Sequence, residues 1–225
     1  LSHRTSQTIT IVPDRFFIRF YGSTATLDKR FFTHALRDEQ RWALAPVSLP
    51  EGQEDVAVYF EFNQQVTATL RRLKPAAICL FLGASPCTRQ KTIRPVPSGT
   101  LRWSSQPVGF GAIPLEELPP LPLILRCTRP LYKHATILAS LSPINSNTSS
   151  GHPFIIEAEY TNHTIIVVNG TQTWRWDFWP LTSEAHHETF SFSRFLLSIL
   201  WATLNENISD RLLVYPETGN IPPGD

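Results

Sequence analysis

The residues best suited by type to covalent chemistry are Cys87, which follows the apolar run Ala76–Leu82, and the triplet His186, His187 and Glu188. A cysteine on a sharp turn after a buried strand acts as a nucleophile when a histidine takes its proton and a carboxylate orients that histidine. These residue types would support the hydrolysis or transfer of an amide or acyl group.

The turn before the cysteine, Gly83-Ala84-Ser85-Pro86-Cys87, offers Ser85 as a second candidate nucleophile. However, Pro86 removes a backbone N–H where an oxyanion would need a donor, and no glycine flanks Cys87. The two histidines fall in the expected first turn of a helix, where exposed polar residues are ordinary. We therefore expect Cys87 to be a loop thiol and the chain to be non-catalytic, with a cysteine-dependent amidotransferase or hydrolase as the alternative.

A second group of interest is the aromatic run at residues 173–181, TWRWDFWPL. If this run continues the strand before it, alternation places Trp174 and Trp176 on one face, and Arg175 and Asp177 on the other. The tryptophans would then cap the core, which is the favoured interpretation. Alternatively, they form a binding platform with the arginine and aspartate at the carboxyl ends of the strands, where open α/β sheets bind ligands. Both roles are open for different residues of the run.

No pattern in the sequence predicts a metal or a cofactor. Three cysteines cannot all pair within one chain, and Cys79, Cys87 and Cys127 have no metal-ligand spacing. Cys79 lies in an apolar run and is expected to be a buried thiol. There is no glycine-rich phosphate-binding motif. Three dispersed histidines are interpreted as lone structural residues: His134, His152 and His163.

The composition is that of a globular protein, with 225 residues of which 42% are hydrophobic and 17% charged. A net charge of +1 gives no argument for nucleic acid as a partner. No apolar run approaches the roughly 18 residues of a membrane span, so we expect no direct membrane insertion of this segment. The densest charges lie on a predicted helix and are interpreted as a solvated face: Asp28, Lys29, Arg30, Arg37, Asp38, Glu39 and Arg41.

The N-terminal half alternates strand and helix patterns. Strands are predicted at Arg15–Tyr21, Asp55–Phe62 and Ala76–Leu82, and the last two are apolar enough to be covered on both sides. Leu27–Arg41 has an apolar stripe at helical spacing, and Asn63 is placed to cap a second helix. This succession predicts a mostly parallel sheet with helices on both faces.

The C-terminal half begins with a change of character, because Thr88–Pro130 is rich in proline and predicts an extended insertion. Strands are then predicted at Ala135–Leu141, Pro153–Tyr160 and Thr164–Asn169, the last two paired as a hairpin. Apolar positions at helical spacing predict a helix over Ala185–Leu204.

These C-terminal elements resemble the glutamine amidotransferase-like domain of large bacterial membrane proteins, which often also carry von Willebrand factor A-type segments. The similarity lies in an apolar strand ending in glycine, Ile165–Gly170, followed by Trp174-Arg175-Trp176, a helix at Phe190–Leu204 and a short strand at Leu213–Pro216. It is best over Leu118–Pro216, while the N-terminal half agrees in element order only.

The resemblance implies a three-layer, flavodoxin-like α/β fold of the class I glutamine amidotransferase type. We expect one such domain over residues 1–216, with 88–130 as its insertion and the start of a linker or following module at 217–225. The resemblance also implies a degenerate, non-catalytic module, a pseudoenzyme that senses, scaffolds or binds a partner. It would belong to a larger membrane-anchored protein and face the periplasm, and its partners would be other domains of that protein or separate proteins.

A further alternative is a secreted or viral glycoprotein interaction domain. It is suggested by four Asn-x-Ser/Thr sequons, a modest excess over chance: Asn147, Asn162, Asn169 and Asn207.

Overall fold

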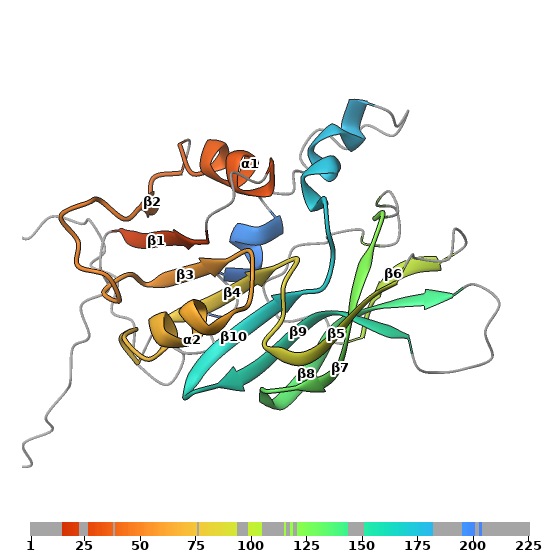
Figure 1. Ribbon diagram of the computed structural model, residues 1–225. Coiled ribbons are helices and arrows are strands. Elements are labelled where there is room, and N and C mark those ends of the chain that lie inside the picture. Colours follow the sequence, from red (N-terminus) through yellow and green to blue (C-terminus); the bar gives the residue numbers. More distant parts are fainter. Residues whose placement is uncertain are drawn as a thin grey trace, which may run out of the picture.

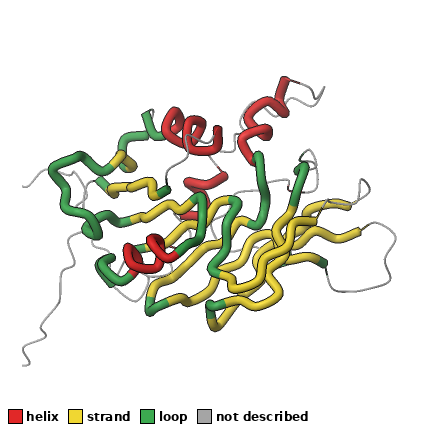
Figure 2. The backbone as a smooth tube through the Cα atoms, in the orientation of Figure 1, coloured by secondary structure: helices red, strands yellow, loops and turns green. Residues whose placement is uncertain are grey.

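The computed structural model describes residues 15–22, 27–37, 39–75, 77–93, 99–104, 115, 118, 121–143, 151–181, 195–200 and 203. Three candidate catalytic residues, His186, His187 and Glu188, lie outside this part of the chain, as do the sequons at Asn147 and Asn207. The described residues form an α/β fold with a mostly parallel central sheet and few helices (Figures 1 and 2).

Five neighbouring strands of the main sheet are parallel, in the order β2-β1-β3-β4-β10. Every residue of β3 and β4 is buried, as their continuous apolar runs predict for strands covered on both sides. The five strands are β1 (Phe16–Tyr21), β2 (Trp42–Leu44), β3 (Val56–Tyr59), β4 (Ile78–Leu82) and β10 (His163–Val168).

The two helices α1 (Leu27–Ala35) and α2 (Gln64–Leu70) cover opposite faces of this parallel sheet (Figure 1). Phe32 of α1 belongs to the same hydrophobic cluster as Val56 and Val58 of β3. Leu70 of α2 belongs to a second cluster with Ala57 and Tyr59, the intervening residues of that strand. Strand alternation thus divides the core into two layers, one on each side of the sheet.

The connections β1–α1–β2 and β3–α2–β4 run toward opposite edges of the sheet. Right-handed connections that run in opposite directions place their helices on opposite faces. The direction of the chain therefore reverses between β1 and β3. Open α/β sheets bind their ligands beside such a switch point, at the carboxyl ends of the strands.

Local hydrogen bonds mark the start of α2 and the end of α1. Asn63 has extended backbone, with φ −147°, and its side chain accepts a hydrogen bond from the Val66 N–H at 3.0 Å, which confirms the predicted N-cap of α2. Helix α1 is shorter than the predicted 27–41. It ends at Ala35, where the Arg37 N–H donates to the His34 carbonyl at 3.1 Å and tightens the last turn.

The sheet continues beyond β10 as an antiparallel extension made of β9 (His152–Tyr160), β8 (Lys133–Pro143) and β6 (Gly99–Trp103). The predicted hairpin between β9 and β10 is confirmed. Its two turn residues, Thr161 and Asn162, have φ values of 49° and 65°. A two-residue turn with both φ angles positive matches the right-handed twist of the strands that it joins.

The Pro-rich segment 88–130 contributes strands, not only extended loops. It supplies β6 to the edge of the main sheet, most of β5 (Cys87–Ile93), and β7 (Ile124–Pro130), which pairs with β5 in a second, two-stranded sheet. A disulfide joins Cys87 to Cys127, with Cα atoms 6.0 Å apart. Cys79 is a free, buried thiol, as predicted.

The predicted C-terminal helix is described over residues 195–200 and at 203. Phe195, Leu196, Ile199 and Leu200 are all fully buried or nearly so. They belong to the hydrophobic cluster on the α1 side of the sheet. The helical spacing of these four residues therefore identified their buried face correctly.

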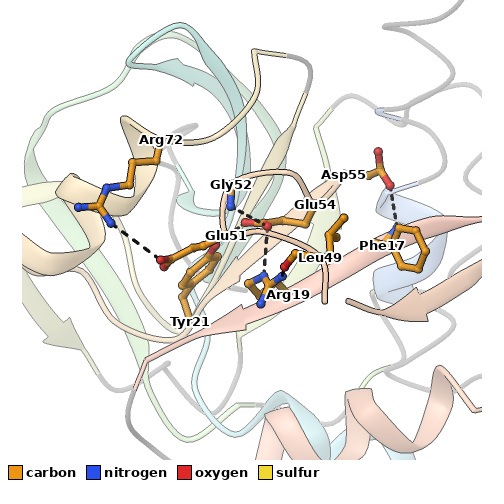
Figure 3. Close-up of polar contacts among 9 residues, drawn as sticks. All are labelled: Phe17, Arg19, Tyr21, Leu49, Glu51, Gly52, Glu54, Asp55 and Arg72. Carbon is orange, nitrogen blue, oxygen red and sulfur yellow. Dashed lines mark hydrogen bonds and ion pairs between the residues drawn. The ribbon is translucent and has the colours of Figure 1, made fainter. Parts of the chain in front are cut away.

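A buried charge network ties β1 to the loop that precedes β3 (Figure 3). The Glu54 carboxylate is fully buried. It accepts hydrogen bonds from Arg19 Nε at 3.1 Å, the Gly52 N–H at 3.0 Å and the Tyr21 hydroxyl. Arg19 also donates through Nη2 to the Leu49 carbonyl at 2.6 Å. Burial, followed by the hydrogen bond to Glu54, raises the pKa of Tyr21 well above its ordinary value.

Candidate functional site

A pocket of about 390 Å³ opens at the carboxyl edge of the parallel strands. Its walls come from the first turn of α1 and from the segments at or just after the ends of β3, β4 and β10. This position, beside the switch point between β1 and β3, is the usual one for ligands of open α/β sheets. The lining residues are Leu27, Asp28, Phe60, Leu82, Gly83, Thr171, Gln172 and Trp174.

Asp28 is held in the pocket by hydrogen bonds from residues that are distant in the sequence. Its Oδ1 atom accepts a bond from the Thr173 hydroxyl at 2.7 Å and another from the Trp174 N–H at 3.0 Å. Thr173 is 145 residues away along the chain. These bonds join α1 to the 3-10 helix η2 (Thr173–Leu181), which is the light-blue coil at the upper right of Figure 1. The bonds from Thr173 and Trp174 thus converge on one carboxylate oxygen.

The prediction that Asp28 belongs to a solvated charged face is wrong. Burial raises the pKa of its carboxyl group, and the hydrogen bonds from Thr173 and Trp174 offset only part of this effect. Among the described residues, no salt bridge reaches Asp28. Charge patterning along a helix misses such a residue. A better signal for a pocket residue is the position of Asp28 in the first turn of the helix that follows a strand of a parallel sheet.

Aromatic side chains form one side of the site. Trp174 stacks on Phe31 of α1 with ring centroids 5.8 Å apart and planes inclined by 15°. Phe178 lies edge-on to both rings, at 5.5 Å from Phe31 and 5.8 Å from Trp174, and is 44% exposed. The half-buried Trp174 is therefore held by aromatic neighbours while it also lines the pocket.

The run TWRWDFWPL is the 3-10 helix η2, so the alternation expected of a strand is not observed. Thr173 and Trp176 are buried, because residues three apart lie on one side of a 3-10 helix. Trp176 is 0% exposed and contacts Phe154 and Phe195, with ring centroids at 5.9 and 5.6 Å. The two tryptophans have different positions: Trp176 is in the core, and Trp174 is at the pocket.

The two polar residues of the predicted platform do not line the pocket. Arg175 is exposed and Asp177 is partly buried. The pocket geometry therefore does not support Arg175 and Asp177 as ligand-binding residues. Trp174, the third member of the predicted platform, does line the pocket. In a 3-10 helix the residues that flank Trp176 point away from its buried side.

The backbone of the pocket adopts left-handed conformations at two facing turns. Gly83, after β4, has φ +63°, and a Cβ there would meet the Gly170 carbonyl at 3.3 Å. Gln172, after β10, has φ 58° although it carries a side chain. Non-glycine residues in this region are uncommon and cluster at binding and active sites.

Of the catalytic candidates, Ser85 and Cys87 lie among the described residues, and the prediction that Cys87 is a loop thiol is wrong. The turn after β4 carries Gly83 and the buried Ser85, whereas Cys87 begins β5 and is joined to Cys127. A disulfide-bonded sulfur has no thiolate to attack a substrate, so a nucleophilic Cys87 would first require reduction. Cys87 also lies outside the residues that line the pocket beside Asp28.

Two further residues that the sequence singled out, His163 and Asn169, are buried in the fold. His163 is buried at the start of β10, where burial lowers the pKa of its imidazole. Asn169 is 2% exposed and donates through Nδ2 to the Pro153 carbonyl at 3.1 Å, so the folded chain cannot present it for glycosylation. Asn162, in contrast, is exposed at the tip of the β9–β10 hairpin. In the part of the chain that the structure describes, no cluster of His, Cys, Asp or Glu could hold a metal, and no helix is long and apolar enough to cross a membrane.

Replacing Asp28 by asparagine is expected to stabilise the folded protein at neutral pH. The amide oxygen still accepts the bonds from Thr173 and Trp174, while the cost of burying a charge is removed. The pKa of Asp28 in the folded protein is raised above its ordinary value of 3.8. The wild-type protein therefore loses stability as the pH rises from about 3.8 through the folded-state pKa and the carboxyl group ionises. We expect Asp28→Asn to gain about 1 kcal/mol in urea unfolding at pH 7 and nothing near pH 3. A loss of stability at pH 7 would instead make the carboxylate a structural group.

No protein-family model matches the chain, and no curated protein matches it significantly in sequence. Three solved structures resemble its backbone at 9–11% sequence identity, with TM-scores of 0.48–0.49. The first is a cytoplasmic protein, STM1381, of Salmonella typhimurium LT2, with 10% identity and a TM-score of 0.49; the match covers 82% of this chain and 98% of that one.

The other two are parts of larger proteins. The carbohydrate deacetylase Agd3 has 11% identity and a TM-score of 0.48, over 86% of this chain and 32% of that one. The β-galactosidase of Bacillus circulans sp. alkalophilus has 9% identity and a TM-score of 0.48, over 87% and 31%. The chain thus spans about a third of these two proteins. Likenesses this distant assign neither a family nor an activity.

Proposed function

We propose that the protein is a non-catalytic, ligand-binding module of the glutamine amidotransferase-like type. One observation carries the proposal. The carboxyl edge of the sheet has a formed pocket around Asp28, while the turn after β4 has no cysteine thiol, because Cys87 lies in β5 and is oxidised. A site that retains its position in the fold but lacks the nucleophile is suited to binding, not to turnover.

Two features support the finer assignment to a flavodoxin-like, amidotransferase-like fold. The parallel order β2-β1-β3-β4-β10 reverses direction beside the pocket, as doubly wound sheets do. The Trp-Arg-Trp motif after β10 supplies a core residue, Trp176, and a pocket residue, Trp174. The motif that carries the resemblance therefore has a defined role in this chain.

We further propose that the module senses or scaffolds within a larger membrane-anchored bacterial protein, on its periplasmic side. The disulfide between Cys87 and Cys127 favours an oxidising compartment over a reducing cytosol. The pocket would then receive a ligand from outside the cytoplasm. Other domains of the same protein, or separate proteins, would be the partners of this module.

The test compares two variants that break the same disulfide. Cys87→Ser removes the candidate nucleophile, whereas Cys127→Ser leaves Cys87 as a free thiol. We expect the wild-type protein, reduced or oxidised, and both variants to release no ammonia from glutamine and no product from an activated ester. Turnover by reduced wild type and by Cys127→Ser, but not by Cys87→Ser, would overturn the proposal and establish a cysteine hydrolase.

A further inference from the structure

We propose that the pocket beside Asp28 binds an organic cation, an amine or quaternary ammonium compound whose positive charge lies against the Asp28 carboxylate. This inference rests on the proposed binding role of the pocket and adds the chemical class of its ligand. It is carried by the charge of the pocket, its aromatic surface and its size.

The charge of the pocket comes from a single group. Asp28 is the one charged side chain among the described residues that line it, and no described cation is ion-paired with it. Its neighbour Lys29 has its ammonium 5.9 Å from the centroid of the Phe20 ring, and Phe20 does not line the pocket. A partly buried carboxylate without a cation lowers the stability of the folded protein. A residue that lowers stability in this way is expected mainly where it serves a function such as ligand binding.

The carboxylate discriminates among classes of ligand. An anion that enters the pocket is repelled by Asp28. A neutral ligand removes water from the carboxylate and leaves its charge uncompensated, which deepens the desolvation cost. A cation replaces that water with an opposite charge. The hydrogen bonds from Thr173 and Trp174 both end on Oδ1 of Asp28, so the cation is expected at Oδ2.

The rest of the lining suits the hydrocarbon part of such a ligand. Trp174 and Phe60 add aromatic surface, and Leu27 and Leu82 add aliphatic surface. Aromatic rings attract ammonium groups through their electron-rich faces, and quaternary ammonium compounds are recognised in this way. Trp174 is already ordered by Phe31 and Phe178, so little conformational entropy is lost when a ligand packs against it. A volume of about 390 Å³ admits a small molecule.

The experiment uses choline and its neutral isostere 3,3-dimethylbutan-1-ol as probes, measured by isothermal titration calorimetry with the full chain. We expect choline to bind the wild type at least about tenfold more tightly than the isostere. Asp28→Asn should weaken choline binding by about tenfold or more, because it keeps the hydrogen-bond acceptor and removes only the charge. Asp177→Asn, the same charge change on η2 outside the pocket lining, should alter the affinity by less than about twofold.

Three results would overturn the proposal: equal affinities for the two isosteres, equal affinities of wild type and Asp28→Asn for choline, or no saturable binding of choline by folded wild type up to about 50 mM. Binding of a neutral sugar in place of choline would assign the pocket to carbohydrates. A further probe, phosphocholine, distinguishes a lipid headgroup from a free cation as the source of the ligand. If choline binds, the proposal is supported whether phosphocholine binds more tightly than choline, as a headgroup would, or more weakly. The comparison of isosteres needs no variant, so it holds even if Asp28→Asn folds poorly. Failure here leaves the non-catalytic assignment intact, because the latter depends on Cys87.

Discussion

Replacing Arg19 by methionine is expected to lower the free energy of unfolding by about 3–5 kcal/mol. The substitution leaves the Glu54 carboxylate, which is 0% exposed, without the cation that compensates its charge. It also removes the bond from Arg19 Nη2 to the Leu49 carbonyl and so loosens the loop before β3. Methionine retains much of the apolar stem, so the loss reports the charge and the hydrogen bonds more than the packing. Urea unfolding at pH 7 measures it.

Two further variants isolate the buried charge. Combining Arg19→Met with Glu54→Gln removes the uncompensated carboxylate, so the double variant should be more stable than Arg19→Met alone. The matched surface control is Arg72→Met. Arg72 and Glu51 are 69% and 49% exposed at 3.9 Å, and their separation should cost less than about 1 kcal/mol. Similar costs for Arg19→Met and Arg72→Met would show that burial of Glu54 contributes nothing.

Replacing Trp176 by alanine is expected to cost about 3–5 kcal/mol of stability. The indole is fully buried between Phe154 of β9 and Phe195 of the C-terminal helix. Its removal leaves a cavity where η2, the sheet and that helix meet, and cavity formation adds to the lost transfer free energy. Guanidinium unfolding followed by far-UV circular dichroism measures the change.

Trp174→Ala is the matched control for Trp176→Ala, because it makes the same deletion two residues earlier in the same 3-10 helix. Trp174 is half-buried and stacks on Phe31, so its loss should cost about 1–2 kcal/mol, clearly less than that of Trp176. If the two variants were equally unstable, the division of the motif into a core residue and a pocket residue would be refuted.

Much of the fold was predictable because its cues are local. The strands β3 and β4 are apolar at every buried position, Asn63 caps α2 through a contact three residues away, and the β9–β10 hairpin spans a two-residue turn. Continuous apolar runs, caps and tight turns act within a few residues of chain. A single sequence therefore carries these signals without any knowledge of tertiary contacts.

The candidate site was less predictable, since each of its decisive contacts spans a long stretch of chain. Asp28 meets Thr173 across 145 residues, and Cys87 pairs with Cys127 across 40. The run TWRWDFWPL contains the residue types of both a core and a binding surface. It forms a 3-10 helix in which Trp176 packs against Phe154 and Phe195, contacts that no local pattern encodes.

By itself, then, the sequence determined the alternation of strands and helices, the two-sided burial of the parallel strands and the apolar face of the last helix. The tertiary structure alone decided which cysteines pair, which tryptophan is buried, and that Asp28 leaves the solvated face of α1 for a pocket. The physical reason is the range of the forces involved. Backbone propensity and hydrophobic periodicity act between near neighbours along the chain, whereas a pocket is defined by side chains that meet only after the sheet has formed.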